Sequence, residues 1–172
     1  MENRYRIPKQ IIKGFIADGT KKSQSKKRNI FIMGCMAGMF IAFGACCSSA
    51  AMFGIEDPGM AKVVAGTIFP VGLMLIILVG GELFTGDCLM VMGALDKKYK
   101  IATMLHKLGV VFISNMIGAS VVVVLVYFSG QLNMSEGTLG AYAIKVAYTK
   151  VNLDYSAAFT SAILCNILVC LA

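Results

Sequence analysis

Tryptophan, histidine and charged side chains are absent or scarce in this sequence. None of the 172 residues is tryptophan, the one histidine is His106, and Lys, Arg, Asp and Glu together make up 15%. Soluble domains contain about 25% charged residues, and disordered chains are rich in charge, so both classes are excluded. The hydrophobic share of 58% instead indicates an integral membrane protein.

The cysteines and the single histidine form no pattern typical of a metal site or a catalytic centre. The six cysteines show no Cys-x-x-Cys spacing, so we interpret them as small apolar residues within helices. We therefore expect no metal ligand, no cofactor and no catalytic residue. A membrane enzyme or redox subunit is disfavoured on the same grounds, and we expect that the protein is not an enzyme.

Four apolar segments are candidates for membrane-spanning helices, each of which needs about 20 residues. They are residues 30–55, 61–81, 108–128 and 155–172, the last preceded by a helical stretch over 141–150. The predicted fold class is therefore an all-α membrane protein. Since the final apolar run reaches the last residue, we interpret the chain as the front part of a longer polypeptide whose carboxy-terminal part is missing.

Positive charge is concentrated ahead of the first apolar segment. Residues 1–29 contain nine Lys and Arg against two Asp and Glu, a net charge of +7 that equals the charge of the whole chain. A second basic segment, residues 96–100, separates two apolar runs. The positive-inside rule places both on the cytoplasmic side of a cell membrane. We expect the lipid bilayer, and no nucleic acid, as the partner of this basic segment.

The domain division follows from the same charge pattern, with a cytoplasmic part over 1–29 and a transmembrane channel domain over 30–172. Apolar residues recur at helical spacing within residues 5–18, which predicts an amphipathic helix. Gly19 is expected to end that helix, with a polar connector over 20–29. The helix could lie in the inner headgroup layer or pack on the rest of the protein.

The second apolar segment is interrupted twice, at Phe69-Pro70 and again after Val79. The later interruption reads Gly80-Gly81-Glu82-Leu83-Phe84-Thr85-Gly86-Asp87, with glycines and carboxylates at membrane depth. Backbone can unwind there only where protein buries it or water lines it, and broken helices of this kind form solute pathways in transporters. We expect Glu82 and Asp87 to cap or pair within the broken segment.

Two segments resemble the signatures of the formate/nitrite transporter family. Residues 77–86 resemble the first signature and read Ile-Leu-Val-Gly-Gly-Glu-Leu-Phe-Thr-Gly; residues 162–172 resemble the second and read Ala-Ile-Leu-Cys-Asn-Ile-Leu-Val-Cys-Leu-Ala. The resemblance covers essentially the whole chain. It implies an aquaporin-like helical bundle with a broken second span, about four of the family's six spans, and a homopentamer with a pore in each protomer. His106 does not match the family's pore histidine, which belongs to the fifth span.

The resemblance also implies a solute path along the broken span. Thr85 corresponds to a residue of the loop that interrupts the span, near the cytoplasmic end of the pore. Leu83 and Phe84, beside it, and Phe69, further outward, correspond to apolar constriction residues. Apolar rings of this kind exclude large hydrated ions, while a threonine hydroxyl and free backbone groups supply a few hydrogen bonds.

Two further residues complete the path that the resemblance implies. Lys150 matches a lysine near the outer vestibule, and Asn166 matches an asparagine of the fourth span. A lysine close to a narrow apolar entrance attracts anions and raises their local concentration. Lys145, one turn earlier, is expected to be solvated, and Asn166 is expected to hold the loop by hydrogen bonds.

These features favour a channel or transporter for small monovalent anions of weak acids: formate, nitrite or hydrosulfide. The alternative is an aquaporin-like pore for small neutral solutes, whose flux would not depend on Lys150. The twin Asn-Pro-Ala motifs of aquaporins are absent from the sequence, which counts against that alternative.

Overall fold

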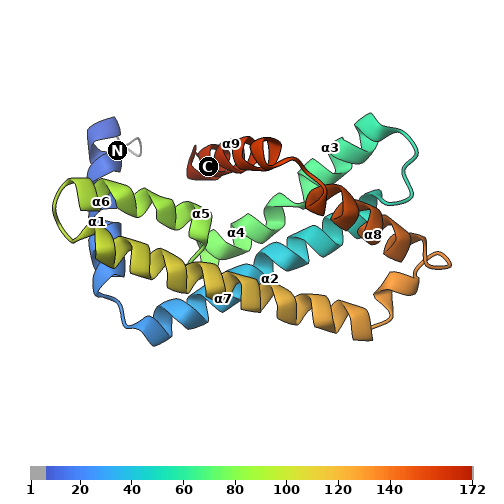
Figure 1. Cartoon of the computed structure of the whole chain (residues 1–172), viewed down its shortest axis with the longest axis horizontal. Helices are drawn as coiled ribbons and strands as arrows, with labels where there is room; N and C mark the ends of the chain where they lie inside the picture. The colour runs from blue at the N-terminus through green and yellow to red at the C-terminus, as the bar shows by residue number, and fades with distance from the viewer. Residues whose placement is uncertain (1–6, 172) are drawn as a thin grey trace, which may run out of the picture.

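The computed structural model describes residues 7–171, and every regular element within them is helical. Three apolar helical stretches are long enough to cross a membrane: α2 (Lys27–Met52), α3 with α4 (Pro58–Val79) and α7 (Ile101–Phe128). The pair α8 (Thr138–Val151) and α9 (Tyr155–Leu171) provides a fourth span if its two bent halves are counted together. Helices α2 and α7 extend along the long axis of the molecule (Figure 1).

Shorter elements complete the chain at and between these stretches. The second span divides into α3 (Pro58–Ile68) and α4 (Pro70–Val79), with Phe69 between them. The others are α1 (Pro8–Gln24), α5 (Phe84–Asp87), η1 (Cys88–Met90), α6 (Val91–Leu95) and η2 (Gln131–Asn133). The predicted interruptions at Phe69-Pro70 and after Val79 therefore both coincide with helix boundaries, and only the later one opens a gap in the span.

The closest helix pair is α2 with α7, which pack through small residues. A Cβ atom added to Gly38 would lie 2.0 Å from the carbonyl oxygen of Asn115, and one added to Gly118 would lie 1.9 Å from that of Cys35. Ser114 of α7 is fully buried, and a Cβ atom added to Gly34 of α2 would lie 1.9 Å from its hydroxyl oxygen. Small residues let membrane helices approach until their backbones touch, so this pair forms the rigid side against which the broken span rests.

The amino-terminal helix continues beyond its predicted end. Gly19 lies inside α1, not at its carboxyl end, and the connector to α2 consists of Ser25 and Lys26 alone. The prediction that Gly19 ends the helix is wrong because Gly19 is buried against another element, where its missing side chain permits close contact. The predicted start at Tyr5 lies outside the described residues.

Helix α1 lies across the end of the longer helices and packs on η1 and α6 (Figure 1). Its amino-terminal half presents Ile7, Ile11 and Ile12 away from the described protein, where they are exposed. Its carboxy-terminal half packs on the protein through the buried Gly19. Of the two alternatives for this helix, packing on the protein applies to its second half. The first half leaves an apolar face free, as a helix in the headgroup layer would.

Tyr99 connects α1 to α6. Its hydroxyl donates a hydrogen bond to the carbonyl of Met90, and Cβ atoms added to Gly19 or Gly93 would each lie 2.6 Å from that hydroxyl oxygen. Tyr99→Phe removes the donor and with it one hydrogen bond to the Met90 carbonyl, which costs about 0.5 to 1.5 kcal/mol. We expect a lower midpoint of thermal unfolding in detergent for this variant. Tyr127→Phe, at an exposed position, should leave the midpoint unchanged; equal shifts in the two variants would contradict the assignment.

The start of the third span and the shape of the fourth differ from their predictions. Helix α7 begins at Ile101, seven residues before the predicted start of its span, and it includes His106 and Lys107. Lys107 does not reach solvent; it is buried and donates to the carbonyl of Ser25. The helical stretch expected to lead into the fourth span is α8, but α8 and α9 meet at 106°.

Candidate functional site

The candidate site is the gap between α4 and α5, where the second span unwinds. Gly80 ends α4 in the left-handed conformation with φ +81°, which glycine adopts without strain. Leu83 is extended, and α5 starts at the next residue. The sequence thus places a helix-ending glycine where the chain must leave the helix.

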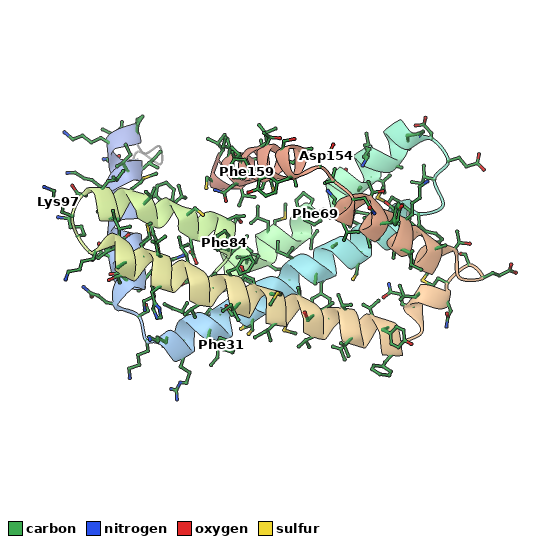
Figure 2. The ribbon with its side chains drawn as sticks, viewed as in Figure 1. Phe31, Phe69, Phe84, Lys97, Asp154 and Phe159 are labelled. Carbon is green, nitrogen blue, oxygen red and sulfur yellow. The ribbon has the colours of Figure 1, made fainter. Side chains whose placement is uncertain are left out.

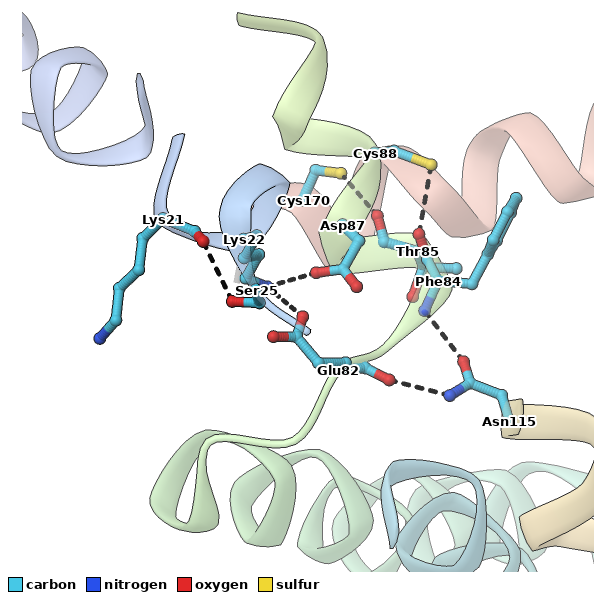
Figure 3. A network of polar contacts seen from close by, with 10 residues as sticks. All are labelled: Lys21, Lys22, Ser25, Glu82, Phe84, Thr85, Asp87, Cys88, Asn115 and Cys170. Carbon is cyan, nitrogen blue, oxygen red and sulfur yellow. Dashed lines mark hydrogen bonds and ion pairs between the residues drawn. The ribbon is translucent and has the colours of Figure 1, made fainter. Parts of the chain in front are cut away.

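Three backbone groups at this gap bind to the two neighbouring helices. The N–H of Glu82 donates to the carbonyl of Met33 on α2 at 3.3 Å. The carbonyl of Glu82 accepts from Asn115 Nδ2 on α7 at 2.8 Å, and the N–H of Phe84 donates to Asn115 Oδ1 at 2.9 Å (Figure 3). An unpaired backbone group at membrane depth costs several kcal/mol. These hydrogen bonds therefore stabilise the unwound segment.

The two carboxylates of the broken segment share one lysine from outside it. Lys22 Nζ on α1 lies 2.7 Å from Glu82 Oε2 and also pairs with Asp87 Oδ1 (Figure 3). The Asp87 side chain is 3% exposed, that of Glu82 15% and that of Lys22 31%. The two carboxylates also interact with each other within the broken segment, but the cation that pairs with both is a lysine from the segment predicted to be a polar connector.

The same ion pairs determine the protonation of the lysine. Burial lowers the pKa of the Lys22 ammonium, but attraction to Asp87, hydrogen bonds to Asp87 and Glu82, and attraction to Glu82 together outweigh it. The pKa therefore lies above its ordinary value of 10.5. At neutral pH, α1 is bound to the break by a fully charged ammonium.

A cavity of about 590 Å³ lies against the break. Its walls come from α1, α4, the unwound segment, α5 and the end of α9, and include Lys22, Glu82, Leu83, Asp87 and Cys170. Of the six residues assigned to the solute path, Leu83 is the one that lines this cavity. The break therefore adjoins a space large enough for several small solute molecules.

Three of the six predicted path residues are consecutive at the break. Leu83 precedes α5, and Phe84 and Thr85 begin it; all three are half-buried. The ring of Phe84 meets the edge of Phe112 on α7, with centroids 5.5 Å apart and planes at 70°. Both the backbone and the ring of Phe84 are thus held from α7.

Asn166 reaches the break through one intermediate residue. Its Nδ2 lies 3.8 Å from Cys170 Sγ, a long and weak contact, and the Cys170 thiol donates to the carbonyl of Thr85 at 3.4 Å. Asn166 Oδ1 is buried and has no hydrogen-bond partner among the described residues. Asn115 binds the backbone of the loop directly, whereas Asn166 reaches the Thr85 carbonyl through Cys170.

The other two predicted path residues lie away from the break. Phe69 joins α3 to α4 and is exposed, nearer to α8 than Phe84 is (Figure 2). Lys150 is exposed in the last turn of α8. Helices α3 and α8 are found at the opposite end of the molecule from α1 (Figure 1). The six residues are therefore spread along the molecule, as a path would be, and are not gathered in one pocket.

Two residues that support the break were not singled out in the sequence. Lys22 belongs to a run of basic residues and carries no distinguishing pattern. Asn115 does carry one, because it is an amide in the middle of an apolar span, where polar residues are rare and mark sites of interaction. The sequence therefore carries a signal for Asn115 but none for Lys22.

Apolar spans, together with a broken helix held around a cavity, define a membrane protein of the channel and transporter class. The family model described as "Formate/nitrite transporter" matches residues 9–172. The chain belongs to this family, as its two signature segments predicted.

Curated relatives agree with this assignment. The chain is 31% identical to the "Probable formate transporter" of Methanothermobacter thermautotrophicus over 100% of its own length and 69% of that protein. It is 34% identical to the "Uncharacterized transporter YrhG" of Bacillus subtilis, over 98% and 64%. It is 29% identical to the "Formate channel FocA" of Escherichia coli K12, over 96% and 59%. The chain thus spans about three fifths to two thirds of the length of these relatives.

Solved structures share the fold. A "Pentameric formate channel with formate bound" superposes with a TM-score of 0.71 at 28% identity, covering 84% of this chain and 58% of that one. An "FNT family ion channel" superposes with a TM-score of 0.72 at 17% identity, covering 94% and 76%. The predicted fold class, a helical membrane bundle with a broken second span, is confirmed.

Proposed function

We propose that this chain forms part of a channel for small monovalent anions of weak acids, with formate as the first candidate and nitrite and hydrosulfide as members of the same chemical class. The relatives named as formate channels support this proposal. The observation that carries it is the break itself. Leu83, Phe84 and Thr85 interrupt a membrane span beside a cavity, on backbone held by α2 and α7.

The proposed path attracts anions at its outer end and excludes large hydrated ions at its apolar constriction. Lys150 attracts anions to the outer end, and the apolar side chains of Phe69, Leu83 and Phe84 strip water from them. An anion that enters an apolar constriction loses much of its hydration energy, so only small ions pass, aided by the Thr85 hydroxyl. Asn166, beside Cys170, is proposed to support the same segment.

The proposed assembly is a homopentamer in the cell membrane with the amino terminus in the cytoplasm. The pentameric formate channel that shares the fold supports the oligomer. Helix α1 and the basic segment 96–100 lie at the same end of the molecule, which agrees with one cytoplasmic side (Figure 1). The division between a cytoplasmic part over 1–29 and a channel domain over 30–172 stays a prediction.

Flux into liposomes tests the proposed function. The complete protein is reconstituted, and light scattering follows the entry of formate, nitrite, hydrosulfide, chloride and glycerol. We expect fast entry of one or more weak-acid anions and slow entry of chloride and glycerol. Lys150→Glu reverses the charge at the outer end and should lower anion entry by about tenfold at low salt, with a smaller effect at high salt.

The matched control is Lys145→Glu, which introduces the same change one turn earlier on α8 at another exposed position. We expect this control to conduct like the wild type. Glycerol entry as fast as formate entry would favour the neutral-solute pore. Equal anion flux in wild type and Lys150→Glu would remove Lys150 from the path.

A further inference from the structure

Asn115 has an unusual position among the polar residues of the described chain. It lies in the middle of α7, with Ile113, Met116 and Ile117 exposed around it on the same apolar helix. Its amide makes three hydrogen bonds, one to α2 and two to the unwound segment: Nδ2 donates to the Gly34 carbonyl at 2.9 Å and to the Glu82 carbonyl at 2.8 Å, and Oδ1 accepts from the Phe84 N–H at 2.9 Å.

Two of these hydrogen bonds lie on either side of Leu83, a residue of the proposed constriction. Glu82 and Phe84 are the residues immediately before and after Leu83, and both of their backbone groups end on the same amide. One side chain therefore fixes both ends of a three-residue segment. The third bond, to Gly34 on α2, fixes the amide itself against the rigid α2–α7 pair.

Phe112 adds a second contact from α7, one turn before Asn115. Its ring meets the ring of Phe84 edge to face at 5.5 Å, a geometry worth about 0.5 to 1.5 kcal/mol beyond burial. The backbone of Phe84 is thus set by Asn115 and its ring by Phe112. Movement of the amide along α7 would shift Leu83 and Phe84 together.

We propose that Asn115 is a positioning residue that sets the width of the apolar constriction, and thereby the size of anion that the channel admits. The inference rests on the proposed function, because it takes Leu83 and Phe84 as the constriction. Asn115 touches no solute in this mechanism; it acts through the backbone on either side of Leu83. Its effect should therefore appear as altered size selectivity and not only as lost protein.

Asn115→Gln is the sharpest test, because glutamine keeps both donors and the acceptor but carries them one methylene further from α7. We expect this variant to assemble and to change the ratio of formate to acetate entry into liposomes by about tenfold, the discrimination that one methyl group produces in an apolar site. Asn115→Leu removes all three hydrogen bonds. The fraction of this variant that assembles should show a change in the ratio of formate to acetate entry at least as large as that of Asn115→Gln.

The control is Ser120→Ala, further along α7, which removes a hydroxyl bonded only within the helix; its ratio should equal that of the wild type. An unchanged ratio in assembled Asn115→Gln overturns the inference while the proposed function stands. Failure of Asn115→Gln to assemble also overturns it, because Asn115 would then serve folding alone. Wild-type protein that passes no formate refutes the proposed function, and this inference with it.

Discussion

Gly118→Ala is expected to reduce the recovery of correctly assembled protein by about fivefold to 150-fold, the equivalent of the 1 to 3 kcal/mol that overpacking costs. The added Cβ would lie 1.9 Å from the carbonyl oxygen of Cys35 on α2. Backbone cannot yield as a flexible side chain does, so α2 and α7 must separate. Separation would also pull Asn115 away from the Gly34 carbonyl. Size-exclusion chromatography of detergent-extracted protein measures the loss.

Gly109→Ala is the matched control on the same helix. No atom lies within 4 Å of the position that its Cβ would occupy, so we expect recovery close to that of the wild type. Comparable losses in the two variants would mean that any methyl group added to α7 is harmful, and would contradict the role assigned to the contact with α2.

Lys22→Met should lower the thermal stability of the protein strongly, because it leaves the carboxylates of Glu82 and Asp87 without their countercharge. Removing one partner of a buried ion pair costs about 3 to 5 kcal/mol, and the partial exposure of Lys22 places the expected loss near the lower figure. Asp87→Asn in the same chain should recover part of the loss, because it removes the more deeply buried of the two unpaired charges. Thermal unfolding in detergent measures both effects.

The dependence on pH follows from the raised pKa of Lys22. A lysine whose pKa is higher in the folded state stabilises that state fully below its ordinary pKa of 10.5 and loses this effect as the pH rises through the folded value. Wild type should therefore lose stability as the pH rises above 10.5, and Lys22→Met should lack this step. Lys13→Met, at an exposed position of α1, is expected to keep it; a step of equal size in Lys22→Met would reject the assignment.

The spans and the break could be predicted from the sequence because their signals are local. Apolar composition located α2 and α9 to within a few residues, and Gly80-Gly81 located the end of α4. Gly19 shows where this reasoning fails. Glycine ends helices when only neighbouring residues are considered, but here it lies inside α1 so that Tyr99 can approach, and residue 99 is 80 positions away in the chain.

The contacts that support the site are harder to predict from the sequence, because they join residues that are distant along the chain. The choice of Lys22 over its basic neighbours depends on which face of α1 meets the break, and that is decided by packing on α6 and η1. Helix α9, which meets α8 at 106°, likewise contacts α5, an element distant in the sequence. The roles of Thr85, Leu83, Phe84, Phe69, Lys150 and Asn166 stay predictions that flux measurements can check.

The position of the break's partners along the chain has a consequence for biosynthesis. A ribosome produces Lys22 before Glu82 and Asp87, so the two carboxylates emerge with their countercharge already made. Asn115 follows only after the rest of the second span. During insertion the charges of the break can be paired at once, whereas the Glu82 carbonyl and the Phe84 N–H must wait for α7. The second span therefore becomes stable in the bilayer only once the third has joined it.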